Sequence, residues 1–109
     1  MPILFVESQY PAHKQNEVLE TWIEANQKYP KPEGLFTTLV DTAVKPEKGI
    51  GLKITSAYLI EPGKYEEAFA YFRKFMTSFF SIEGYTYEFN FWATIEEAMS
   101  AIDTPMPER

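Results

Sequence analysis

The strongest constraint on the fold is a row of large apolar side chains that recur at helical spacing. The row extends over about four helical turns, and its members are Tyr65, Ala68, Phe69, Phe72, Phe75, Met76, Phe79 and Phe80. Pro62 and Gly63 lie before the row and Gly84 follows it, so the helix has clear ends. A helix with so broad an apolar side is typical of a protein core, and the core interpretation is preferred to a cofactor-binding aromatic motif.

The rest of the chain supplies strands and two further helices. Strand patterns cover residues 3–10, 35–44, 50–60 and 85–93, and an amphipathic helix covers residues 12–29. Residues 45–49 form a short link with Pro46 and Gly49, so the second and third strands are expected to form a hairpin. Thr94 is a good N-cap for a short last helix with an apolar stripe at Ile95, Ala98, Met99 and Ile102.

This order of elements predicts an α+β domain of ferredoxin-like βαββαβ topology. It would have a four-stranded antiparallel sheet, two helices on one face and a short C-terminal helix. Alternation along the hairpin places Phe36 and Val40 on one face and Leu39 on the other. Two helices cover only one face of such a sheet. The second apolar face therefore predicts a sheet-to-sheet homodimer, or a higher homo-oligomer.

Size, charge and residue inventory narrow the functional classes. A chain of 109 residues predicts one domain over residues 1–103, followed by a tail over residues 104–109. The net charge of −6 and the scattered lysines and arginines argue against nucleic acid as a partner. The chain has no cysteine, and its N-terminus is apolar only as far as Val6 and has no basic segment. We therefore expect a cytoplasmic protein with no secretory signal, no disulfide and no membrane partner.

Two segments carry a resemblance to a known superfamily. These are the aromatic helix from Tyr65 to Phe80 and the tyrosine-rich last strand that ends at Trp92 and precedes a terminal helix. With the element order, they resemble the dimeric α/β-barrel superfamily over essentially the whole chain. That superfamily includes stress-responsive barrel proteins, monooxygenases of the antibiotic-biosynthesis type and haem-degrading enzymes, and the chain is placed in none of these families. The resemblance implies two ferredoxin-like subunits that pack sheet to sheet around a cavity.

The haem-degrading branch uses an asparagine, a tryptophan and a late histidine. The only histidine here, His13, comes early, in the first turn of the first helix, so no haem or other cofactor is expected. Metal binding is also not expected, because Glu66–Glu67 and Glu96–Glu97 are adjacent pairs that diverge around a helix. His13 itself is interpreted as an exposed residue more readily than as a general base.

The best candidate site lies on the last strand. Glu88, Asn90 and Trp92 alternate, so their side chains share one face, with Glu88 and Asn90 roughly 7 Å apart. In a dimer cavity, this row and Tyr58 of the hairpin would orient a small polar aromatic ligand. The row is more typical of the solvated side of an edge strand, or of polar groups satisfied at a dimer seam, than of a ligand site. Four other polar residues would either line the cavity or end strands in water: Glu7, Gln9, Thr37 and Asp41.

These patterns predict a homodimer that binds a small aromatic or quinone-like molecule in a cavity beside the sheet. The first alternative is a cofactor-independent monooxygenase or isomerase, and the second is a purely structural oligomerisation module. The sequence leaves open whether the protein is an enzyme.

Overall fold

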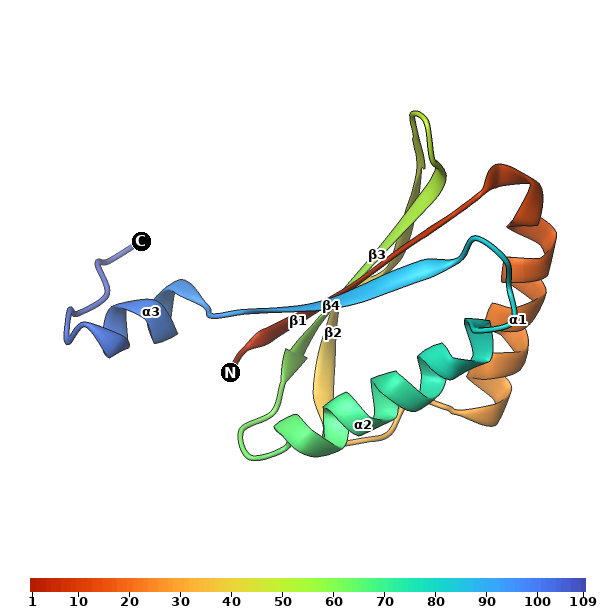
Figure 1. Cartoon of the computed structure of the whole chain (residues 1–109). Helices are drawn as coiled ribbons and strands as arrows, with labels where there is room; N and C mark the ends of the chain where they lie inside the picture. Colours follow the sequence, from red (N-terminus) through yellow and green to blue (C-terminus); the bar gives the residue numbers. More distant parts are fainter.

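The computed structural model describes all 109 residues as one sheet with helices packed on one side (Figure 1). The elements in chain order are β1 (Ile3–Tyr10), the 3₁₀ turn η1 (Ala12–Lys14), α1 (Gln15–Lys28), β2 (Phe36–Glu47), β3 (Gly51–Ile60), α2 (Tyr65–Met76), the 3₁₀ turn η2 (Thr77–Phe79), β4 (Thr86–Trp92) and α3 (Ile95–Ala101). The four strands lie in the order β2-β3-β1-β4, and every neighbouring pair is antiparallel. The predicted α+β class is confirmed, and the arrangement is compatible with a ferredoxin-like fold. None of the helices has the length and apolar character needed to cross a membrane.

The hairpin is longer than predicted. β2 continues three residues beyond Val44 to Glu47, and Pro46 pairs with Leu52 inside the ladder. Proline donates no backbone hydrogen bond, but β2 is an edge strand and tolerates it. The turn is therefore shorter than the predicted link and lies between Glu47 and Gly51.

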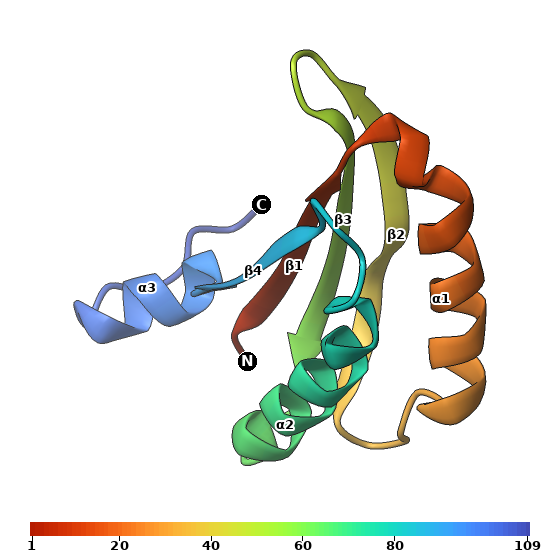
Figure 2. The same cartoon turned by 45° about the vertical axis from the view of Figure 1, so that its right-hand side comes forward.

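One face of the sheet forms the core with α1 and α2 (Figure 2). The core residues of the strands include Leu4, Val6, Tyr58 and Ile60, and they pack against Phe72 and other residues of the aromatic helix. The ring centroids of Tyr58 and Phe72 lie 4.5 Å apart. The middle of the predicted row is therefore in the core, whereas Tyr65 and Phe80 at its two ends are 44% and 67% exposed. The last turn, at Thr77–Phe79, is 3₁₀.

Two irregularities in β2 correct the predicted faces of the hairpin. The register with β3 shifts between Thr38 and Val40 and again between Val40 and Ala43. Phe36 packs in the core, 4.9 Å from Phe72, whereas Val40 pairs with Ala57 on the other face. The prediction that Phe36 and Val40 share a face is wrong, because a bulge shifts the alternation by one residue.

The face turned away from α1 and α2 is called the open face below. Its side chains form four rows across β4, β1, β3 and β2. These are Trp92, Ile3, Leu59 and Thr37; Asn90, Phe5, Ala57 and Val40; Glu88, Glu7, Thr55 and Ala43; and Thr86, Gln9, Lys53 and Lys45. The first two rows are mostly apolar and are called the apolar end. The other two are mostly polar or charged.

Candidate functional site

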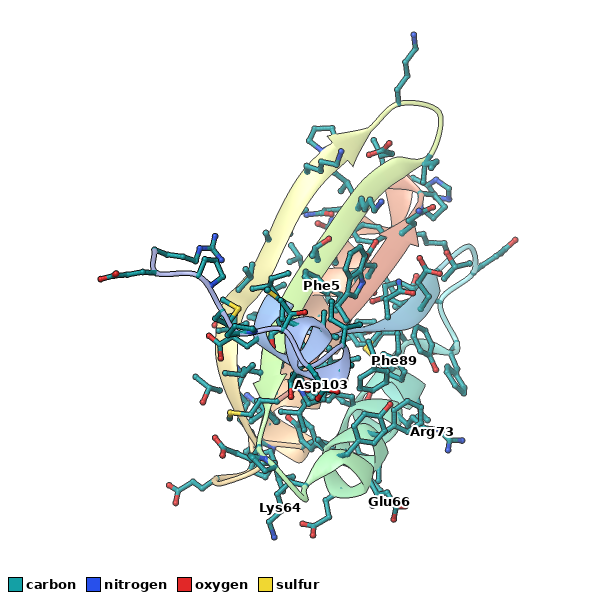
Figure 3. The ribbon with its side chains drawn as sticks, turned by 90° about the vertical axis from the view of Figure 1, so that its left-hand side faces the viewer. Phe5, Lys64, Glu66, Arg73, Phe89 and Asp103 are labelled. Atoms are coloured by element: carbon teal, nitrogen blue, oxygen red, sulfur yellow. The ribbon has the colours of Figure 1, made fainter.

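The predicted row of β4 lies on the open face. Glu88, Asn90 and Trp92 pair with successive open-face residues of β1, as their alternation predicts. Trp92 is 62% exposed, and its ring meets that of Phe5 edge-on at 5.9 Å between centroids. Figure 3 looks onto this face and shows Phe5 on it.

Tyr58 lies on the opposite face. Only 7% of it is exposed, and its ring packs between Phe36 and Phe72 in the core. The structure therefore brings Glu88, Asn90 and Trp92 together and places Tyr58 apart from them. Asp41 lies on Tyr58's side of the sheet, whereas Glu7, Gln9 and Thr37 lie on the open face.

A cavity of about 300 Å³ lies between the sheet and the two long helices. It exists because α1 packs loosely. Only Val18 and Ala25 of this helix are buried, while Leu19 and Trp22 line the cavity and stay partly exposed. Most of the lining is apolar or aromatic, as is usual for pockets that bind small organic molecules.

Two serines lie on the sheet side of this cavity, where the strands otherwise carry larger side chains. Ser8 of β1 is 3% exposed and Ser56 of β3 is 6% exposed. Their inward neighbours Val6 and Ile54 also line the cavity. Small side chains at these positions leave volume empty, and their hydroxyls put hydrogen-bonding groups at its base.

The bulged part of β2 forms the next wall. Thr42 has φ of +54°, a left-handed conformation that is rare for a β-branched residue. Its hydroxyl lies 3.4 Å from the hydroxyl of Ser56 and 3.4 Å from a carboxylate oxygen of Asp41. Such strain persists only where the surroundings enforce it, and it is concentrated at binding sites. The wall thus adds a third hydroxyl beside the two serines.

The phenols around the cavity hold their protons. Burial raises the pKa of Tyr85 to about 12, and it also raises the pKa of Tyr10 and of Tyr58 above the ordinary value. The Tyr85 ring stacks on Phe79 at 4.7 Å, and the Tyr10 hydroxyl donates to Gln15 Oε1. Near neutral pH these groups are therefore neutral hydrogen-bonding groups.

One ion pair lies in the cavity lining. Lys31, from the link between α1 and β2, lies 3.3 Å from Asp41. Both side chains are substantially exposed, which places the pair towards water. His13 is outside this site, exposed in the η1 turn.

The open face carries a second, more open hollow. Its lining includes Glu7, Gln9 and Glu88, and Glu7 lies 3.7 Å from the ammonium group of Lys53. Nowhere do three or more histidine, cysteine, aspartate or glutamate side chains gather as metal ligands would.

The sequence prediction missed Ser8, Ser56 and Thr42. A signal for the serines was present, because each occupies an inward position of a strand rich in β-branched and aromatic residues. Thr42 had no such signal, because its exceptional backbone arises from the bulge. No protein-family model matches the sequence, and no curated protein matches it either.

Proposed function

We propose that this protein binds a small, largely apolar molecule, of aromatic or quinone-like type, in the cavity between the sheet and the two long helices. The observation that carries the proposal is the pair of buried serine hydroxyls at the base of a mostly apolar cavity. A volume of about 300 Å³ is at the small end of the range for ligand pockets. The ligand would turn a carbonyl or hydroxyl oxygen towards Ser8, Ser56 and Thr42.

The lining favours binding over a reaction of the ligand. Asp41 is the only carboxylate in it, and this side chain is paired with Lys31. The buried phenol of Tyr85 keeps its proton until about pH 12. The cavity thus supplies hydrogen bonds more readily than a general base. A monooxygenase or isomerase activity has no comparable set of residues to support it.

The proposal includes a homodimer of two ferredoxin-like subunits packed through their open faces, as in the dimeric α/β-barrel superfamily. Support comes from the apolar end, where Trp92 and Val40 are exposed and where Ile3, Phe5 and Leu59 are only partly buried. Apolar side chains so placed lose contact with water when a second sheet covers them. Cytoplasmic localisation stays a prediction from the sequence.

The two tryptophans allow a direct test of the site. Trp22 lines the cavity and Trp92 lies on the open face. In Trp92→Phe, Trp22 is the only tryptophan, and titration with menadione, a small quinone, should quench its fluorescence along a saturable curve. The matched variant Trp22→Phe keeps only Trp92, whose quenching should rise linearly without saturation.

Saturable quenching of Trp92 alone would place the ligand on the open face and overturn the proposed cavity. The titrations should be repeated with naphthol and other aromatic alcohols. Linear quenching of both variants by all of these compounds would contradict the proposal that the protein binds small aromatic molecules.

A further inference from the structure

We propose that α3 is an exchanged arm, which packs its apolar side on the open face of a second copy of this chain. The inference rests on the homodimer proposed above and adds the element that completes its interface. Four features of the structure lead to it: the capped start of the helix, its exposed apolar side, its position and length, and the limited size of the open face.

The arm is a well-defined helix. The Thr94 hydroxyl accepts a hydrogen bond from the backbone N–H of Glu97, and the Glu97 side chain accepts one from the backbone N–H of Thr94. This reciprocal capping box satisfies two backbone groups at the start of the helix. The Glu97 carboxylate also lies 3.1 Å from the N-terminal amine of Met1, which joins the base of the arm to the start of β1.

The helix nevertheless buries nothing in its own subunit. None of its residues is buried, and Ile95 and Ile102 are 54% and 70% exposed. Figure 1 shows α3 standing away from the sheet, on the side opposite α1 and α2. A capped amphipathic helix of seven residues gains little stability unless its apolar side is covered.

The position and length of α3 suit a second sheet. Figure 3 shows the helix in front of the open face, and the residue just before it in the sheet, Trp92, belongs to the apolar end. Seven residues rise about 10 Å along a helix axis. Packed sheets lie about 10 Å apart. A second sheet on the open face would therefore lie alongside the arm over its full length.

The sheet alone is small for a stable dimer. The four rows of the open face hold about sixteen residues, and only the first two rows are mostly apolar. A standard interface uses about 20 to 30 residues on each partner. In an isologous dimer each arm reaches the other copy, so two arms enlarge the contact at once. Ile95, Met99 and Ile102 would supply the added apolar contact.

A lipid surface is a less suitable partner for the apolar side of the arm than a second copy of the chain. Glu96, Glu97 and Asp103 make the arm acidic. An anionic lipid surface would repel such a segment. A second copy offers apolar side chains at the edges of its open face, where Trp92 of β4 and Val40 of β2 are exposed.

Sedimentation equilibrium of the full chain tests the arm. The double variant Ile95→Asp/Ile102→Asp should raise the dimer dissociation constant at least about tenfold. The matched variant Ile23→Asp changes an equally exposed isoleucine of α1 and should leave the constant as in the wild type. Circular dichroism should show all three proteins folded, because the arm contributes nothing to the core.

A second measurement shows which copy the arm contacts. The chain lacks cysteine, so Ser100→Cys accepts one spin label on the arm. When labelled chains are mixed with ¹⁵N chains free of label, amide signals of the ¹⁵N open face, such as those of Phe5 and Ala57, should broaden. The amide signals of residues on the exposed side of α1, such as Gln27, should not broaden.

The outcomes separate the two proposals. A monomeric wild type overturns the dimer and the arm together, while ligand binding at Trp22 is decided by its own titration. A dimeric wild type with unchanged arm variants, or without broadening between chains, overturns the exchanged arm alone.

Discussion

At the scale of single residues, the cavity depends on side chains that are smaller and more polar than their places in the sheet would predict. Ser8 and Ser56 lie at inward positions of the two central strands. A valine at either place would fill space and add apolar contact, but each serine hydroxyl also interacts with a buried phenol, Ser8 with that of Tyr85 and Ser56 with that of Tyr58. The serines therefore satisfy phenols of the fold and also line the cavity.

Ser56→Val should separate binding from stability. The variant removes a hydroxyl and fills part of the cavity, so affinity for menadione should fall at least about tenfold. The free energy of unfolding should change by less than about 1 kcal/mol, because the added apolar contact offsets the lost contacts of the Ser56 hydroxyl with Thr42 and Tyr58. The measurements are a Trp22 quenching titration and chemical denaturation.

Thr55→Val is the control, because it lies next to Ser56 on the same strand and faces the open side. It should bind menadione as the wild type does. Equal affinities in the two variants would contradict a role for Ser56.

The tyrosine beside the cavity predicts a loss of stability in alkali. Burial raises the pKa of Tyr85 in the folded chain to about 12, from an ordinary value of 10.0 in the unfolded chain. Below pH 10 both states keep the proton, so the contribution of this residue to stability is constant. Between pH 10 and 12 the unfolded state loses the proton first, so stability falls as pH rises.

Denaturation at a series of alkaline pH values should therefore show a smaller fall for Tyr85→Phe than for the wild type. Phenolate absorbance of the folded protein gives a second readout. Ionisation of all seven tyrosines near pH 10 would contradict the raised pKa.

At the scale of elements, the start of β3 depends on a close approach of two backbones. Gly51 has φ of +132°, and a Cβ atom there would collide with the backbone oxygen of Tyr10 and the backbone nitrogen of Ala12. Gly51→Ala should destabilise the protein by about 3 kcal/mol or more. Gly49→Ala also has positive φ but meets no atom, so it should cost only about 1 kcal/mol.

Urea denaturation of the two glycine variants tests this difference. Similar losses would mean that the contact beside Gly51 relaxes easily and that only the backbone conformation matters.

Elements set by local interactions were predictable from the sequence. β1 has the predicted limits, and Thr94 caps α3 as predicted, because strand alternation and capping depend on neighbouring residues. The course of β2 was not predictable. Its bulges and the positive φ of Thr42 depend on the register of its pairing with β3, and the alternation of residues along β2 alone does not reveal that register.

The candidate site was predicted only in part. The shared face of Glu88, Asn90 and Trp92 follows from alternation alone, and the structure shows it. The separation of Tyr58 from this row depends on how β3 pairs with β1. The cavity depends on how loosely α1 covers the sheet, which its own periodicity does not reveal.

At the scale of the whole molecule, the two faces of the sheet differ in what covers them. The helix-covered face holds the core and the cavity. The open face and α3 carry apolar side chains with no partner in the subunit. The proposed ligand binding and the proposed dimerisation can therefore be tested separately, because a change on one face leaves the residues of the other face in place.

Phe5→Asp should convert a dimer into a folded monomer. Phe5 lies in the second open-face row and belongs to no part of the buried core cluster, so a charge there opposes sheet packing without unfolding the subunit. The melting temperature of the wild type should rise with protein concentration over a roughly hundredfold range, because dissociation is linked to unfolding. The melting temperature of Phe5→Asp should be lower and independent of concentration.

The control variant is Gln27→Asp, which introduces the same side chain at an exposed position of α1, away from the open face, and should behave as the wild type. A wild-type melting temperature that does not change with concentration, in a protein that sediments as a monomer, would show that the open face has no second copy to cover it.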